Sequence, residues 1–240
     1  MADWQDQGII VNPRHFGEND ALVHIFTQQH GLCAGIVKYG QTKRLKPILQ
    51  LGQQVSVKWR ARLETQLGNF NLEPLKSPSP QIMLEKGRLY CLSAALSLIQ
   101  NVMAEHEPHP AAYDDLNALI LTLESDVWAE TYAKWEIALL NDIGFGLDFS
   151  SCAATGERDD LCYVSPKSGR AVSKNAGLPY HDRLLPLPEF LMKAGAKAGA
   201  DQLTQALRMS GHFLSKGPLA HSNHGLPLAR TRLLSYVSKI

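Results

Sequence analysis

The sequence lacks the features that mark membrane proteins and disulfide-rich secreted domains. Its longest apolar run, around Leu89–Ile99, is interrupted by tyrosine and serine and is too short to span a bilayer. Only four cysteines occur among 240 residues, and their scattered positions favour a reduced setting. The N-terminus has neither the basic lead nor the apolar run of a secretory signal. We therefore expect a cytoplasmic protein that makes no membrane contact.

Signatures of catalysis are missing as well. The sequence contains no Gly-x-Ser-x-Gly elbow, no phosphate-binding loop and no dinucleotide fingerprint. Two His-x-x-His pairs, His106/His109 and His221/His224, lie beside proline or glycine, and neither has a third ligand in view. We interpret them as surface histidines and expect no catalytic residue, no cofactor and no metal. A metal-dependent hydrolase built on these histidines is the alternative hypothesis.

Acidic residues are absent from residues 38–62, a stretch that holds seven Lys or Arg residues in a chain of net charge +1. Its last part alternates in polarity, so a strand there would bury one face and expose the other. The inward positions are Val55, Val57, Trp59 and Ala61, and the outward positions are Ser56, Lys58, Arg60 and Arg62. Two interpretations stay open: a solvated edge that discourages strand aggregation, or a surface that binds phosphates.

Five short strand patterns separated by turns precede residue 78. They are Gly8–Pro13, Ala21–Thr27, Leu32–Lys38, Val55–Arg62 and Gln66–Leu72. Five strands in so short a segment predict a small antiparallel barrel. An oligonucleotide-binding barrel (OB-fold) is our preferred interpretation, and an SH3-like barrel stays open. Trp59 falls on the apolar face and is expected in the core, whereas Phe16 and Tyr39 flank turns and could stack on bases.

The segment Pro74–Pro80 contains three prolines and predicts an extended linker that excludes helix and central strand. Beyond it the hydrophobic period changes to that of helices. The predicted helices are Gln81–His106, Ala112–Glu124, Trp128–Ile143 with Asp126 as N-cap, Pro188–Lys197, Asp201–Ser215 and Leu226–Ser238. Their cations, Arg88, Lys134, Arg208, Lys216, Arg230 and Arg232, are expected mostly at solvated edges.

The order of many modest motifs resembles that of the RecO family of DNA repair proteins. The matching segments are Gly8–Val11, Phe16–Asp20, Phe26–Gly31, Lys38–Lys46, Cys152–Gly156, Ser168–Arg170, Gly211–Leu214 and Leu226–Arg230. The resemblance covers nearly the whole chain. It implies an α+β fold, with an OB-fold barrel over residues 1–78 and a helical domain over residues 79–240. Residues 148–176 would form an insert that resembles a zinc ribbon.

The resemblance also implies a function. Members of the family are non-enzymatic recombination mediators that bind single- and double-stranded DNA and anneal complementary strands. With RecR they load RecA onto strands coated by single-strand-binding protein, whose acidic, aromatic-ended tail they bind. We accordingly expect a nucleoid-associated protein of this pathway. The alternative from another class is a protein-interaction scaffold with little DNA affinity.

The insert departs from the family pattern in one respect. Many relatives hold zinc with two Cys-x-x-Cys pairs. Here Cys152 keeps one ligand, while Thr155, Ala171 and Lys174 occupy the other three positions, and Cys162 is off the spacing. We therefore predict that the ribbon has lost its metal.

The predicted DNA-binding residues are the cations of the barrel. They are Arg14, Lys38, Lys43, Arg44, Lys46, Lys58, Arg60 and Arg62. The hypothesis is that they form one electrostatic surface, which would hold phosphates without reading base sequence.

Overall fold

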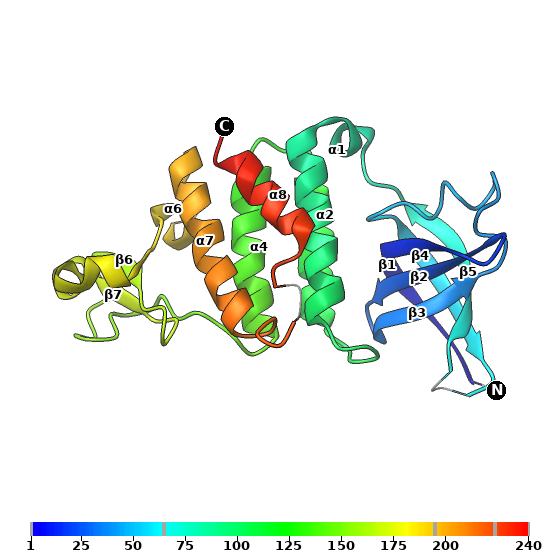
Figure 1. The fold of residues 1–240 in the computed structure, drawn as a ribbon, viewed down its shortest axis with the longest axis horizontal. Helices are drawn as coiled ribbons and strands as arrows, with labels where there is room; N and C mark the ends of the chain where they lie inside the picture. The colour runs from blue at the N-terminus through cyan, green and yellow to red at the C-terminus, as the bar shows by residue number, and fades with distance from the viewer. Residues whose placement is uncertain (1, 64–65, 194–195, 223–224, 240) are drawn as a thin grey trace. The chain divides into compact units, whose positions relative to one another are not determined.

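The computed structural model describes residues 2–63, 66–193, 196–222 and 225–239. The chain forms two compact units, residues 1–124 (unit 1) and residues 125–240 (unit 2). Figure 1 shows strands gathered in the N-terminal part of the chain and helices in most of the rest. Within the described residues, every helix is too short or too polar to cross a membrane.

Unit 1 begins with a closed barrel of five strands in the order β1-β2-β3-β5-β4. The strands are β1 (Ala2–Phe16), β2 (Asp20–Thr27), β3 (Gly31–Val37), β4 (Gln54–Ala61) and β5 (Gly68–Lys76). All neighbours are antiparallel except β3 and β5, which pair in parallel over a short stretch. The α+β class and the five N-terminal strands are confirmed.

The predicted alternation of β4 is confirmed. Its four apolar side chains are buried, with Trp59 only 2% exposed, whereas Lys58 and Arg60 are exposed. Trp59 pairs with Trp4 of β1 on one side and Phe70 of β5 on the other. Gly68 leaves room for its ring, because a Cβ atom at Gly68 would lie 2.1 Å from the indole Nε1. The hydrophobic face of β4 therefore determines which way its cations point.

Strand β1 is longer than predicted, because it begins at Ala2 rather than near Gly8. Asp6 is a buried residue of this strand, and its carboxylate accepts a hydrogen bond from the Gln29 backbone N–H at 2.8 Å and lies 3.0 Å from the His30 ring. Trp4 stacks on the same ring, with centroids 4.2 Å apart. Because a carboxylate occupies an inward position, this part of the strand does not show the alternation of hydrophobic and polar residues that predicts a strand.

The extended linker predicted over Pro74–Pro80 is wrong at both ends, although β5 pairs at Pro74 with β4 alone and is not a central strand there. Pro74 lies within β5 and pairs with Val55 beside a bulge, where the ladder does not need its missing N–H. At the other end, Pro80 is the first residue of helix α1 (Pro80–Leu84), where a proline is tolerated. Ser79 caps this helix by accepting a hydrogen bond from the Gln81 N–H.

Unit 1 ends with helices that pack on the barrel. The predicted helix over residues 81–106 is interrupted at Glu85, so that α1 is followed by α2 (Lys86–Val102), and α3 spans Pro110–Thr122. Tyr113 of α3 lies against Phe26 of β2, with ring centroids 6.0 Å apart. The His106 N–H donates to the Leu32 carbonyl of β3 at 2.9 Å. The division of the chain at residue 78 stays a prediction, and the compact unit continues to residue 124.

Unit 2 contains helices α4 (Trp128–Asp142), α6 (Glu189–Met192), α7 (Ala200–Lys216) and α8 (Leu228–Val237). The proposed N-cap at Asp126 is wrong, because α4 begins after Val127 without a side-chain cap. The segment between α4 and α6 holds a three-stranded sheet of β6 (Leu161–Val164), β7 (Ala171–Ser173) and β8 (Leu185–Pro186). Helix α5 (Lys174–Gly177) and the 3-10 helix η1 (Leu178–Arg183) connect β7 to β8.

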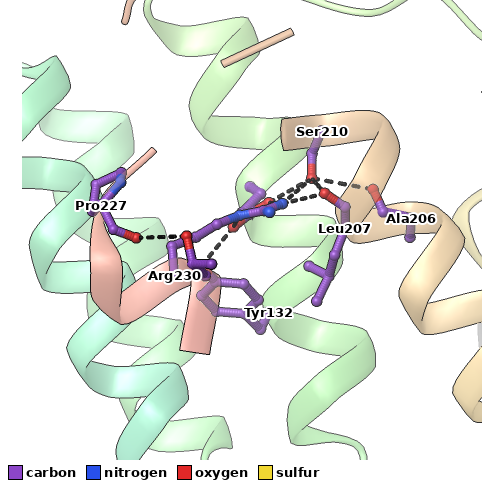
Figure 2. Close-up of polar contacts among 8 residues, drawn as sticks. Tyr132, Ala206, Leu207, Ser210, Pro227 and Arg230 are labelled. Carbon is purple, nitrogen blue, oxygen red and sulfur yellow. Dashed lines mark hydrogen bonds and ion pairs between the residues drawn. The ribbon is translucent and has the colours of Figure 1, made fainter. Parts of the chain in front are cut away.

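A buried ion pair joins three helices of unit 2. Figure 2 shows Arg230 of α8 reaching toward Ser210 and Leu207 of α7. Its guanidinium donates to both carboxylate oxygens of Glu136 in α4, at 3.1 and 3.0 Å, and to the Leu207 carbonyl. The same carboxylate accepts hydrogen bonds from the hydroxyls of Tyr132 and Ser210. Burial opposes the charge of Arg230, but the attraction of Glu136 outweighs it and raises the pKa of the guanidinium.

The expectation that Arg230 and Arg88 lie at solvated edges is therefore wrong. Arg230 is 1% exposed, and Arg88 is buried with hydrogen bonds to the Glu85 carboxylate and the Leu123 carbonyl. A buried cation is tolerated where its donors find charged or carbonyl partners, and both residues meet that condition.

We predict that breaking the Glu136–Arg230 pair destabilises the protein strongly. Arg230→Met or Glu136→Gln alone should lower the free energy of unfolding by about 3–5 kcal/mol, because each leaves a buried charge without its partner. The double variant should lose less than the sum of the two, as measured by urea unfolding. The matched control is Arg232→Met, an exposed position of the same helix, which should change stability by no more than about 0.5 kcal/mol. Additive losses would show that the pair is not coupled.

Candidate nucleic-acid interface

Asp20 joins two segments at one end of the barrel: the β1–β2 turn, residues 17–19, and the loop between β3 and β4, residues 38–53. Its carboxylate accepts hydrogen bonds from the Tyr39 backbone N–H at 2.9 Å and from Lys38 Nζ at 2.8 Å. The hydrogen bond from Lys38, and next the one from Tyr39, lower the pKa of Asp20. The Gln41 N–H also donates to the Asn19 carbonyl at 3.0 Å. The loop is therefore held against the turn.

Apolar side chains anchor the same loop from below. Leu45, Ile48 and Leu49 pack against the core of the barrel. Lys43 and Arg44, which precede these apolar residues, and Lys46, which lies between them, are exposed. The loop therefore packs its apolar side chains against the core of the barrel and exposes its cations to solvent.

Five of the eight predicted residues lie at this end, which we call the cationic end: Arg14, Lys38, Lys43, Arg44 and Lys46. Arg14 pairs with Leu22 close to the β1–β2 turn. Within the described residues, no carboxylate lies within ion-pair distance of Lys43, Arg44 or Lys46. The acidic residues near these cations are Glu18 of the turn and Asp20 at the start of β2, and Asp20 is paired with Lys38. The cationic end therefore keeps an excess of positive charge.

The other three predicted residues, Lys58, Arg60 and Arg62, form a second group. Arg60 pairs with Asp3 near the start of β1, eleven positions along that strand from Arg14. At about 3.3 Å per residue this is about 36 Å along the strand. Polar residues flank the group, since Lys58 lies between Gln5 and Asn71 in the sheet. The structure thus brings five of the eight residues together and places the other three toward the opposite end of β1.

Two exposed aromatic residues accompany the cationic end. Phe16, the last residue of β1, is 43% exposed, and Tyr39, the first residue after Lys38, is 65% exposed. Phe16 pairs with Asp20, whose side chain also binds the Tyr39 backbone. Cations beside exposed rings are the chemistry that binds single-stranded nucleic acids. The role of Asp20 was not predicted, although Gly17, Asn19 and Asp20 are residue types typical of a turn and were the signal that could have revealed it.

The insert in unit 2 has a cysteine, Cys152, at one of the four ligand positions of the family's zinc ribbon, and its other cysteine, Cys162, lies off that spacing. Cys152 is 1% exposed, and its Sγ accepts a hydrogen bond from the Ser173 N–H at 3.3 Å. Burial raises the pKa of this thiol, but hydrogen bonding, chiefly from Ser173, outweighs burial and lowers the pKa to about 6. Gly156, with φ +76°, closes the loop by donating to the Cys152 carbonyl at 2.9 Å.

This donor set does not fit zinc. Of the three further positions, Ala171 is a buried alanine, Lys174 carries a positive charge, and the Thr155 hydroxyl donates to Glu157. Zinc is held by thiolate, imidazole or carboxylate ligands, usually four of them. Within the described residues, no cluster of three or more His, Cys, Asp or Glu could hold a metal ion. His224 lies outside the described residues, so the His221/His224 pair stays a prediction.

The architecture defines a class of α+β proteins with an N-terminal barrel and C-terminal helices, and comparison with known proteins identifies the family within it. The family model "Recombination protein O N terminal" matches residues 1–78, and "Recombination protein O C terminal" matches residues 86–216. The chain belongs to the RecO family.

Relatives named DNA repair protein RecO match over nearly their full lengths. The relative from Rhodospirillum centenum is 45% identical over 99% of this chain and 95% of its own. That from Ruegeria sp. (strain TM1040) is 44% identical over 99% of both chains. A relative from Caulobacter vibrioides is 40% identical over 99% of this chain and 98% of its own.

We predict that the purified protein contains no stoichiometric zinc and that a chelator leaves its thermal midpoint unchanged. The reason is the missing donors at residues 155, 171 and 174, so that no folding free energy comes from metal binding. Elemental analysis tests the first statement and thermal unfolding the second. A variant carrying Thr155→Cys, Ala171→Cys and Lys174→Cys is the positive control for zinc uptake. About one zinc per wild-type chain, lost in Cys152→Ser, would contradict the prediction.

Proposed function

We propose that this protein is a non-enzymatic mediator of recombinational DNA repair that binds DNA through its barrel. The observation that carries the proposal is the cationic end of the barrel, in a chain that belongs to the RecO family. The five strands and their closure agree with an oligonucleotide-binding barrel. Loops that carry positive charge over such a barrel follow a phosphate backbone.

The cationic end suits DNA of any sequence. Lysine and arginine at exposed positions contact phosphates, and phosphate contacts position a strand without reading its bases. A protein that anneals complementary strands needs this property, because it must hold two strands of unspecified sequence. We propose that it binds single- and double-stranded DNA, anneals complementary strands, and acts in the cytoplasm with RecR to load RecA onto strands coated by single-strand-binding protein.

We further propose that unit 2 binds the acidic tail of single-strand-binding protein. A tail that ends in an aromatic residue and a free carboxylate needs a cation beside apolar surface. Lys134 of α4 is half-buried among apolar residues of its helix, and Lys216 lies beside Phe145 and Phe213 at a surface cavity of about 290 Å³. Either position offers the required chemistry.

We predict that Lys43→Ala combined with Arg44→Ala weakens DNA binding and flattens its salt dependence. Each phosphate contact on a single strand contributes a slope of about −0.7 in the logarithm of the binding constant against the logarithm of salt concentration. The double variant removes two such contacts and should therefore lose about 1.4 units of slope, equally for different sequences. The measurement is fluorescence anisotropy with a labelled oligonucleotide across a salt series.

The matched control is Arg208→Ala combined with Lys239→Ala, which removes the same two charge types from exposed positions of unit 2. It should leave both affinity and slope unchanged. A second comparison is Lys58→Ala combined with Arg60→Ala, which tests the other basic group. If the Lys43/Arg44 variant keeps the wild-type slope, the loop is only a solvated edge, and a wild-type protein without DNA affinity would favour the scaffold alternative.

We also predict that a synthetic acidic peptide with an aromatic C-terminal residue binds the full-length protein through unit 2. Lys134→Ala or Lys216→Ala should weaken peptide binding, because the tail loses a cation for its carboxylate, while the Lys43/Arg44 variant should bind it as the wild type does. Isothermal titration calorimetry provides the affinities. Loss of peptide binding in the Lys43/Arg44 variant alone would place the site on the barrel instead.

A further inference from the structure

The aromatic residues of the barrel divide sharply by exposure. Residues 1–78 contain six of them, of which Phe26, Trp59 and Phe70 are buried and Trp4 is half-buried against the core. The remaining two, Phe16 and Tyr39, are exposed, and both lie at the cationic end. Packing therefore accounts for four of the rings and leaves these two without a role in the core.

Backbone contacts fix the positions of both residues. Tyr39 has φ +55°, a left-handed conformation that residues with a side chain seldom adopt. Asp20 Oδ1 accepts its N–H, and the Tyr39 carbonyl accepts hydrogen bonds from both the N–H and the hydroxyl of Thr42, at 3.0 and 2.8 Å. Phe16 is held by its strand pairing with Asp20. A strained residue that keeps a large ring in solvent points to a function for that ring.

Single and double strands present different surfaces to such rings. The faces of unpaired bases are accessible and stack on aromatic side chains, whatever the base. In a duplex the same faces are covered by neighbouring base pairs, so only phosphates remain for the exposed cations. Rings beside a cationic loop thus add affinity for one form of DNA and not for the other.

We propose that Phe16 and Tyr39 form a base-stacking site that gives the cationic end a preference for single-stranded over double-stranded DNA. The inference rests on the proposed DNA-binding function and adds to it a preference for single strands. Lys43 and Arg44 bind phosphates of either form, whereas Phe16 and Tyr39 bind only unpaired bases. Asp20 is a positioning residue, because it touches the Tyr39 backbone and the Lys38 ammonium.

The test compares single-stranded and duplex oligonucleotides on the full-length protein. Phe16→Ala and Tyr39→Ala should each weaken single-strand binding by about 5- to 150-fold, the range that follows from stacking energies of about 1–3 kcal/mol per base. Duplex affinity and the salt slope should not change, because no cation is removed. Tyr39→Phe keeps the ring and should keep the affinity.

Unit 2 provides a matched control. Tyr180 is 59% exposed, close to the 65% of Tyr39. Tyr180→Ala should leave single-strand binding at its wild-type level. Thermal unfolding of all three alanine variants checks that any loss does not come from misfolding.

A second measurement leaves the protein unchanged. A single strand of abasic sites keeps every phosphate but offers no base, so the wild type should bind it about as weakly as the Phe16/Tyr39 double variant binds a normal strand. The double variant should bind the two strands alike. A wild type that binds abasic and normal strands equally, or alanine variants that lose duplex and single-strand affinity together, would overturn the inference. In either case an altered salt slope in the Lys43/Arg44 variant would still support the proposed function.

Discussion

The pairing of β1 with two neighbours determines where the charged residues of unit 1 lie. Its first half pairs with β4 and its second half with β2, with a bulge between Ile10 and Asn12. This arrangement closes the barrel and carries the β1–β2 turn to the loop between β3 and β4, where Asp20 joins them. The same arrangement places β4's outward cations near the start of β1. One strand thus separates the basic residues into two groups.

The net charge of the chain is only +1, so the distribution of its charged residues says more about binding than their sum does. The cationic end keeps unpaired lysine and arginine side chains, while the exposed Lys38–Asp20 pair contributes little to stability in water. That pair is better understood as a positional contact, since it holds the loop and Tyr39 beside the turn. The buried pair of Glu136 and Arg230 differs, because both charges are removed from water and each depends on the other.

Much of the barrel could be predicted because its strands follow simple alternation, as β4 does from Val55 to Ala61. The first half of β1 could not, because its inward positions include Asp6 and Gly8 as well as Trp4. Asp6 is tolerated inside only because Gln29 and His30 bind it, and no local pattern reveals such partners. Arg230 was misplaced for the same reason, since its partner Glu136 lies 94 residues away.

The candidate site could be predicted in its residue types but not in its geometry. The absence of acids from residues 38–62 indicated seven of the eight proposed cations, and the neighbouring turns indicated Phe16 and Tyr39. That these residues bind DNA stays a prediction. Their division into two groups depends on strand register, which the sequence does not display. The absence of zinc ligands could be predicted once the family resemblance supplied the ligand positions, since Thr155, Ala171 and Lys174 cannot supply thiolates. That the protein holds no zinc stays a prediction.

We propose that DNA binds at the cationic end of the barrel, and the base-stacking site depends on this proposal. Ultraviolet cross-linking of a single-stranded oligonucleotide to the full-length protein, followed by mass spectrometric mapping of the linked peptides, tests it most directly. We expect cross-links within residues 14–20 and 38–46, with Phe16 and Tyr39 among the linked positions. Cross-links confined to unit 2, or to residues 58–62 of the second basic group, would contradict it.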